Sequence, residues 1–375
     1  MTYRAEQALA RYFADDDSRQ FGTGWIAGTL AVSLGLLVNT AVLCLHFPDL
    51  LTVPELRSFY PLGLVRTAID LAILAVFVLA GLSLLLRRRK ALGLAALGLA
   101  GLALLLGAGG VPIGRTGPGT IYLGLDWFVL GTLTTAALFV PIERRWPLRS
   151  AQGPFRRGWL TDAEYFFVSH ALVQLMSVLV MLPAVKLGSW LAVPGLSAAV
   201  QSVPLALQAI GCLIVADLAQ YWVHRAFHRF PPLWRFHAIH HSAERMDWLA
   251  GSRLHLLDVI ATRGLVLLPL VVIGFDERAV LAYLAFVSIH AVFIHANFAP
   301  RSRWLERWLV LPRFHHWHHA REVRDVNFAV HLPLLDQLFG THHLPEGEWP
   351  RRYGTDGPAP PGGWLRQLAW PFRAR

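Results

Sequence analysis

The sequence of 375 residues is long enough for two or three soluble domains, but its composition excludes that organisation. Charged residues make up only 15% of the chain and hydrophobic residues 55%, compared with about 25% and 45–50% in an average globular protein. The net charge of +10 comes from basic residues at the ends of apolar runs, so it indicates membrane lipid headgroups as the partner and excludes nucleic acid.

Eight apolar runs are long enough to cross a bilayer, for which a helix needs about 20 residues. The runs cover residues 25–45, 68–86, 91–111, 121–141, 166–185, 203–223, 259–275 and 279–296. The sequence therefore predicts an all-α fold, a polytopic integral membrane helical bundle of about eight transmembrane helices. Residues 1–22 are charged and lack an apolar core, so we expect a cytosolic tail and no cleaved signal peptide.

Basic loops orient the predicted bundle, because Lys and Arg accumulate on the cytoplasmic side of a membrane. The loops at 87–90 and 144–157 are rich in arginine, so both are expected to be cytoplasmic. Counting onward places the ends of the sixth and eighth spans on the same side. Residues 300–314, where arginines alternate with Trp and Leu, are expected to form a helix in the headgroup plane.

Histidine is the most informative residue type, and the chain has 17. Three sets have the spacing i, i+4 or i, i+3, i+4, so the rings of each set project from one face of a helix. The sets are His224 and His228; His237, His240 and His241; and His315, His318 and His319. Because a structural zinc ion takes only four ligands, these imidazoles predict two metal ions with three to five nitrogen ligands each.

Imidazole suits iron, copper, nickel and zinc, so the ligand type does not choose the metal. Iron is favoured by the setting, because an open coordination position beside lipid allows dioxygen chemistry on an unreactive alkyl chain. A membrane metal transporter remains an alternative, although it needs its ligands near the bilayer midplane. A zinc-dependent membrane hydrolase is another, but His-Glu-x-x-His is missing and Glu244 and Asp247 are the only acids near the second set.

The three histidine sets and their flanks resemble the histidine boxes of the fatty acid hydroxylase/sterol desaturase superfamily. The boxes correspond to residues 224–228, 237–241 and 315–319, in that order. The flanks that agree are Asp217, Tyr221, Trp222, Ser242 and residues 327–329 and 335–341. The similarity covers about residues 160–345 and is specific, because three spaced boxes and a trailing motif coincide.

The resemblance implies a non-haem di-iron centre of two Fe ions in a histidine-box cap on the cytosolic face. Such enzymes use dioxygen, and electrons from an external donor protein, to hydroxylate or desaturate a lipid. The substrate stays open among sterols, fatty acyl chains, ether lipids, sphingolipids and carotenoids, and so does the choice of reaction. The expected location is a bacterial inner membrane or the endoplasmic reticulum.

By the same resemblance, the ligands are His224, His228, His237, His240, His241, His315, His318 and His319. The family also takes a ligand from the end of the last span, which matches His295, with His290 as a further candidate. His255 and Asp258 lie where many relatives have residues at or beside the metals. Asp217 shares a helix face with His224, so it is expected either to accept the N–H of a ligand imidazole or to join two helices.

These predictions divide the chain into four parts. Residues 1–22 form the cytosolic tail, and residues 23–142 a four-span region without an assignable motif. Residues 143–350 form the catalytic domain that the resemblance implies. Residues 351–375 are a basic tail rich in Pro and Gly, which we expect to be loosely ordered.

Overall fold

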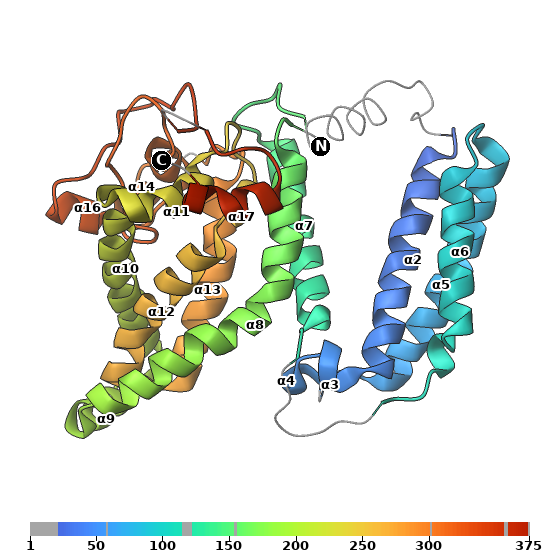
Figure 1. Cartoon of the computed structure of the whole chain (residues 1–375), viewed down its shortest axis with the longest axis horizontal. Coiled ribbons are helices and arrows are strands. Elements are labelled where there is room, and N and C mark those ends of the chain that lie inside the picture. The colour runs from blue at the N-terminus through green and yellow to red at the C-terminus, as the bar shows by residue number, and fades with distance from the viewer. Residues whose placement is uncertain are drawn as a thin grey trace. The chain divides into compact units, whose positions relative to one another are not determined.

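The computed structural model of the chain describes residues 22–57, 59–114, 122–153, 156–300, 302–355 and 359–373 (Figure 1). The chain divides into two compact units, which among the described residues comprise 22–132 and 133–373. Both are helical, and the isolated β-bridges between described residues pair Pro147 with Phe298 and Ala320 with Tyr353.

The first unit is built on three long helices, α2 (Trp25–His46), α5 (Leu62–Leu86) and α6 (Ala91–Leu105). Its shorter segments are α3 (Pro48–Leu51), α4 (Pro54–Arg57) and the turn η2 (Ala108–Gly110). Small residues, among them Ala31, Ala80 and Ala100, are buried between the helices. A Cβ atom at Gly35 would lie only 2.9 Å from the Cβ of Leu99. Close backbone approach through small residues is typical of helices that pack within a membrane.

Helix α7 (Leu125–Arg145) contains the boundary between the two units. Near its start, the Asp126 carboxylate accepts a hydrogen bond from the backbone N–H of Val53. Near its end, the Glu143 carboxylate accepts the backbone N–H of Asn297. The acidic residues of this helix thus lie close to its ends, where they accept backbone N–H groups of other segments.

The second unit is built on four long helices, α8 (Trp159–Leu191), α10 (Leu205–Arg229), α12 (Leu256–Ile273) and α13 (Glu277–His295). A short helix, α9 (Pro194–Gln201), connects α8 to α10. Helix α12 packs against both α8 and α10, and α10 packs against α13. The apolar core between them contains Cys212, Leu270 and Tyr283, so the cysteine serves as a small buried hydrophobe.

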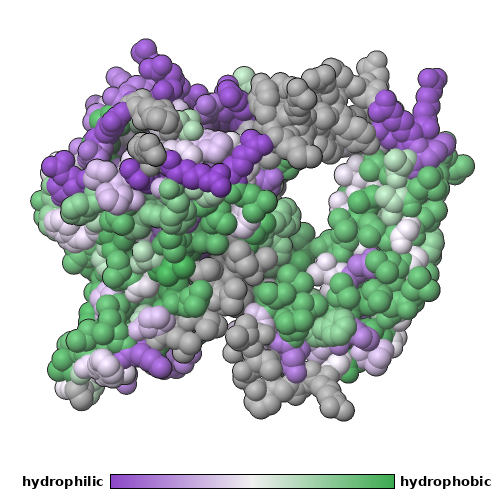
Figure 2. Space-filling model, in the orientation of Figure 1, coloured by the Kyte–Doolittle hydropathy of each residue, from purple (hydrophilic) through white to green (hydrophobic). Residues whose placement is uncertain are grey.

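Short helices gather at one end of this bundle and form a cap (Figure 1). They are α11 (Pro231–His241), η3 (Ala250–Ser252), α14 (Leu305–Trp308), α15 (Pro312–His318), α16 (Leu334–Leu338) and α17 (Trp364–Arg373). Helices α11 and α15 both begin with proline, whose fixed φ favours the first helical position and whose missing N–H is not needed there. Figure 2 shows a hydrophilic surface over the cap and an apolar band beside it on the bundle.

Among the described residues, seven helices are long and apolar enough to cross a membrane. They are Trp25–His46, Leu62–Leu86, Ala91–Gly110, Leu125–Arg145, Leu205–Arg229, Leu256–Ile273 and Glu277–His295. They coincide with seven of the predicted spans, so the all-α, polytopic membrane fold is confirmed. The remaining predicted span, residues 166–185, falls in α8, where the side chains of residues 169–178 lie outside the described part. The predicted cytosolic tail also lies outside it, apart from Gly22.

Two predicted segments differ from the structure. Residues 300–314, of which residue 301 is not described, do not form one helix, because the chain is extended at Leu309 and the Val310 N–H donates to the carbonyl of His331. The C-terminal segment, expected to be loose, contains α17, which packs against α8 and α11. Helix α17, near the C-terminus, is therefore an ordered part of the cap.

Candidate metal centre

Nine of the predicted ligand histidines come together in the cap. They come from the end of α10, from α11, from the end of α13, and from α15 with the residue that follows it. They are His224, His228, His237, His240, His241, His295, His315, His318 and His319. Eight of them are buried, so their ring nitrogens need partners inside the protein.

The nine rings form two groups. The five-ring group contains His224, His228, His237, His241 and His318, and the four-ring group contains His240, His295, His315 and His319. Within each group, one nitrogen of every ring lies within 4.8 Å of one nitrogen of every other ring. Four to five nitrogens around one point match the ligand number of a transition metal ion.

Hydrogen bonds determine which ring nitrogen carries the proton in the five-ring group. His224 Nδ1 donates to the carbonyl oxygen of Phe328 at 2.8 Å, and His237 Nδ1 donates to the Asp258 carboxylate at 2.8 Å. Because a neutral imidazole has only one N–H, both Nε2 atoms carry lone pairs. These Nε2 atoms lie 3.0 Å apart, so two lone pairs face each other.

The same pattern occurs in the four-ring group. His240 Nδ1 donates to the carbonyl of Arg253 at 3.2 Å, and His295 Nδ1 donates to the carbonyl of Ala291 at 2.6 Å. The two Nε2 atoms, which therefore carry lone pairs, are 3.2 Å apart. His315 Nε2 lies 3.0 Å from His295 Nε2. A cation between these nitrogens would turn a repulsive arrangement into a bonded one.

Other ring nitrogens have no hydrogen-bond partner among the described residues. Within the two groups they are Nε2 of His228, His241 and His318, and Nδ1 of His315 and His319, and outside them Nε2 of His316 is unpaired as well. Leaving a buried polar atom unpaired costs roughly 1–3 kcal/mol. Unpaired nitrogens concentrated in both groups indicate two positions shaped for metal ions, and the donor set fits them.

Burial also keeps the rings in the form that binds metal. It lowers the pKa of His240, His241, His315, His318 and His319 well below the ordinary value of 6.5, and the neighbouring imidazoles lower it further. These rings are therefore neutral near pH 7. Neutral imidazole is the ligand form, so no proton has to leave them before a metal binds.

A buried ion network supports the four-ring group. Arg253, whose carbonyl accepts from His240, donates from Nε to Asp162 at 2.6 Å. Arg156 donates to Asp162 and to Asp247, both at 2.6 Å. The four charged side chains are buried, and two positive charges face two negative ones. The network therefore holds the segment from 247 to 253 without a net buried charge.

Gly251 in this segment lies directly against a ligand ring. A Cβ atom at this position would lie 2.9 Å from Nδ1 of His295. Since real side chains do not approach a ring nitrogen so closely, glycine is what allows η3 to pack on the end of α13.

Asp217 has a different role from the two that we expected. Its carboxylate is fully buried and accepts three backbone N–H groups, those of residues 330–332. It thus holds the loop that follows α15 against α10.

Asp336 organises the preceding part of that loop by accepting the N–H of Phe328. Two backbone carbonyls in this part of the loop accept hydrogen bonds from candidate ligand rings. The carbonyl of Phe328 accepts from His224, and that of Val326 accepts from His318 Nδ1 at 2.8 Å. The trailing motif therefore positions the acceptors that orient two ligand rings.

Two predicted candidates lie outside both groups. His290 Nε2 donates to the carbonyl of Val310 at 2.9 Å, and its Nδ1 lies 3.1 Å from Nδ1 of His331. His255 accepts a backbone N–H of α12 with Nδ1, and its Nε2 donates to the carbonyl of Leu368. Because both nitrogens of each ring are engaged, neither ring is free to coordinate.

The ion network of Arg156, Asp162, Asp247 and Arg253 was not predicted from the sequence. The position of Asp162 could have indicated the network. Only 15% of the residues are charged, yet Asp162 lies at the start of an apolar run. A carboxylate in such a position requires a positive partner when it is buried.

The region that contains this site is similar to a known protein family. Residues 209–341, which contain all nine ligand candidates, match the model of the fatty acid hydroxylase family. An ornithine lipid hydroxylase from Rhizobium tropici is 33% identical over 171 residues, which are 45% of this chain and 51% of the relative. A fatty acid hydroxylase from a Lecanicillium species is 29% identical over 149 residues, 34% of this chain and 40% of the relative.

An alkylglycerol monooxygenase from Caenorhabditis elegans is 26% identical over 148 residues, 39% of this chain and 29% of the relative. The chain thus spans about half or less of the length of these three relatives. No solved structure matches the chain.

Proposed function

Because residues 209–341 match the fatty acid hydroxylase family model, we propose that the protein is a membrane oxidoreductase that hydroxylates a lipid C–H bond. The observation that carries the proposal is the convergence of nine imidazoles on two points, with ring nitrogens that have no other partner among the described residues. Candidate spans α10 and α13 end at these rings, so an apolar chain in the membrane lies next to the site.

The proposed cofactors are two iron ions, one in the five-ring group and one in the four-ring group. Iron bound by imidazole supplies the redox chemistry that dioxygen requires. The protein keeps the ligand rings neutral and oriented. Asp258 and the carbonyls of Phe328 and Arg253 hold Nδ1–H of three rings, so their Nε2 lone pairs point at the metal positions.

The proposed reaction replaces a C–H bond of the lipid by C–OH. One oxygen atom of dioxygen enters the lipid and the other leaves as water, with a pair of electrons and a pair of protons supplied through a separate donor protein. Hydroxylation is favoured over desaturation because the relatives at 33% and 29% identity are hydroxylases, whereas a sterol desaturase is 24% identical. The names of the three relatives described above also favour a substrate with a long acyl or alkyl chain.

The proposed location is a bacterial inner membrane or the endoplasmic reticulum, with the cap on the cytoplasmic side. The basic loops at 87–90 and 144–157 support this orientation. Residues 143–350 are the proposed catalytic part. The role of residues 23–142 stays open, and they lie outside the family match.

Metal content and dioxygen consumption of the purified protein test the proposal. We expect about two iron ions per chain, and dioxygen consumption that requires both lipid and a reductant. His240→Ala in the four-ring group and His318→Ala in the five-ring group should abolish activity and lower bound iron. His342→Ala, which removes an exposed histidine, is the matched control and should change neither. A folded His240→Ala variant with full activity would contradict the proposal.

The alternative classes give different results in the same assays. A metal transporter would move metal ions across proteoliposomes without consuming dioxygen. A hydrolase would contain zinc and cleave its substrate without a reductant. Either result would replace the proposed oxygenase.

A further inference from the structure

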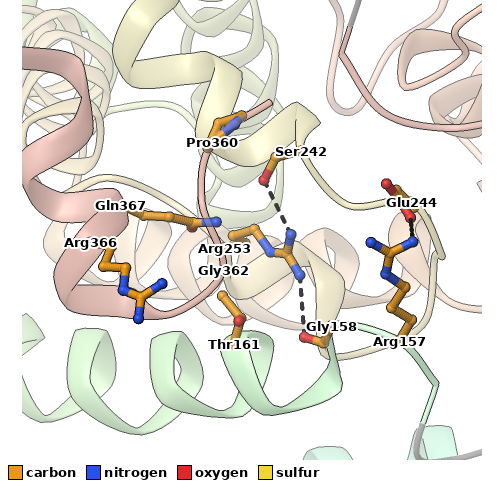
Figure 3. Close-up of a pocket in the computed structure, with 10 residues that line it drawn as sticks. All are labelled: Arg157, Gly158, Thr161, Ser242, Glu244, Arg253, Pro360, Gly362, Arg366 and Gln367. Carbon is orange, nitrogen blue, oxygen red and sulfur yellow. Dashed lines mark hydrogen bonds and ion pairs between the residues drawn. The ribbon is translucent and has the colours of Figure 1, made fainter. Parts of the chain in front are cut away.

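A polar cavity lies between α17, the first turn of α8 and the segment that follows α11 (Figure 3). It is distinct from the metal centre, because Arg253 stands between the two. The guanidinium of Arg253 lines the cavity, whereas its backbone carbonyl accepts from the ligand candidate His240.

The cavity carries a positive charge. Arg157, Arg253 and Arg366 line it, together with the single carboxylate of Glu244. Glu244 is paired with Arg157 at 3.3 Å, and Arg253 is paired with Asp162 outside the lining. Arg366 has no acidic partner within the described part of the chain. The guanidinium of Arg366 therefore remains available to balance the charge of a negative ligand.

Gln367 supplies an unpaired polar group at the same place. Its side chain is only 1% exposed, and its Oε1 has no hydrogen-bond partner among the described residues. Figure 3 shows its amide nitrogen pointing into the cavity, towards Arg253. The Nε2 group that points there makes no hydrogen bond with a described residue, so it can donate to a ligand that accepts hydrogen bonds, whereas Oε1 can only accept and does not bear on the ligand.

Helix α17 places this cavity at the height of the lipid headgroups. Its exposed side chains include Leu365 at 73% and Phe372 at 67%, seven residues apart and hence on one face. Leu257, in the first turn of the candidate span α12, is also exposed, and the Phe372 ring packs on Phe236 at 5.5 Å. Comparison of Figures 1 and 2 shows α17 where the hydrophilic cap meets the apolar band.

We propose that this cavity binds the phosphate of an anionic phospholipid, while the exposed face of α17 rests against the acyl chains. The planar guanidinium of Arg366 matches a phosphate through paired N–H donors. The N-terminus of α8, a helix of 33 residues, adds the positive end of its dipole at Gly158. The proposal is independent of the reaction at the metal centre.

Native mass spectrometry of the delipidated, full-length protein tests this site. Phosphatidylglycerol should bind with one tight site, and phosphatidylcholine with the same acyl chains should not. Arg366→Gln should weaken phosphatidylglycerol binding about tenfold or more, the equivalent of roughly one charged hydrogen bond. Arg373→Gln is the matched control, since Arg373 is also exposed on α17 but does not line the cavity, and it should bind as the wild type does.

Three outcomes would overturn the assignment. Equal weakening by Arg366→Gln and Arg373→Gln would mean general attraction to a charged lipid, with no cavity involved. Displacement of the lipid by millimolar inorganic phosphate would make free phosphate the ligand. Gln367→Met replaces the buried amide by an apolar side chain of similar length. If this variant bound phosphatidylglycerol as the wild type does, the amide would not contact the lipid, which contradicts the proposed site.

Discussion

The two imidazole groups lie next to each other, with His241 and His319 stacked at 4.3 Å between ring centroids, yet the protein supports them differently. In the five-ring group, Asp258 accepts from His237, and a carboxylate partner makes an imidazole a stronger ligand. In the four-ring group, the acceptors of His240 and His295 are backbone carbonyls. One residue type thus builds one group of five rings that a carboxylate supports and one group of four rings whose acceptors at His240 and His295 are carbonyls.

Low pH is expected to lower the stability of the folded, metal-free protein through both ring groups, and this is the largest of the expected effects. The folded pKa of rings such as His315 and His318 lies below 6.5, so below that pH the unfolded chain binds protons that the metal-free folded protein does not. Stability is therefore complete above pH 6.5 and falls as pH decreases, by up to about 1.4 kcal/mol per pH unit for each ring. Melting temperatures of the metal-free protein from about pH 7.5 to 5.5 measure this. A melting temperature independent of pH would contradict the burial of neutral rings.

Removal of one ligand from each group should separate the two positions. His315→Ala leaves three rings in the four-ring group, whereas His241→Ala leaves four rings in the other. We expect both variants to lose iron, and His315→Ala to lose more than His241→Ala, because four imidazoles complete a site better than three. Iron per chain by elemental analysis is the measurement. Equal losses in the two variants would mean that the groups do not differ in this way.

Loss of the carboxylate that supports His237 should weaken only the five-ring group. Asp258→Asn is expected to lower iron affinity there by roughly 10–100-fold, because it removes the charge that makes this imidazole a strong ligand. Competition with an iron chelator measures the effect. Thr262→Val is the control, since Thr262 donates to the other oxygen of Asp258 and its loss leaves the bond to His237 in place. A similar loss in both variants would assign the effect to packing of α12.

The smallest change is a methyl group at Gly251, which should affect only the four-ring group. The added Cβ would lie 2.9 Å from His295 Nδ1, so Gly251→Ala must displace the ring or η3 at a cost of about 1–3 kcal/mol. Thermal unfolding and iron content measure the result. Gly264→Ala provides the control, because a Cβ there meets nothing within 4 Å. Unfolding temperatures that match in the two variants would show that η3 yields without strain.

The apolar spans and the histidine rings that come together could be predicted because their signals are local. A run of about 20 apolar residues has few folds open to it in lipid, and spacings such as that of His237, His240 and His241 place rings on one helix face in any context. Even His295, which has no partner at ligand spacing in its own helix, was reached through the family resemblance.

The supporting structure could not be predicted, because it depends on residues that are distant in sequence. Helix α17 starts where the Gly363 N–H donates to Thr161 and the Trp364 N–H donates to Glu164, both about 200 residues earlier in the chain. The expected surface helix at 300–314 is interrupted by a backbone bond from Val310. Tertiary contacts decide both cases.

Helix α15 has a consequence for the order in which the protein matures. It supplies His318 to the five-ring group and His315 to the four-ring group, and His319 follows at its end. During synthesis, the candidate span α10 and the cap helix α11 leave the ribosome before α15 has been made. Neither ion position is therefore complete until the chain has been translated past residue 319. Loading of both proposed metal positions with their full ligand sets must therefore follow translation of α15, because a nascent chain that ends before this helix lacks one ring of the five-ring group and two rings of the four-ring group.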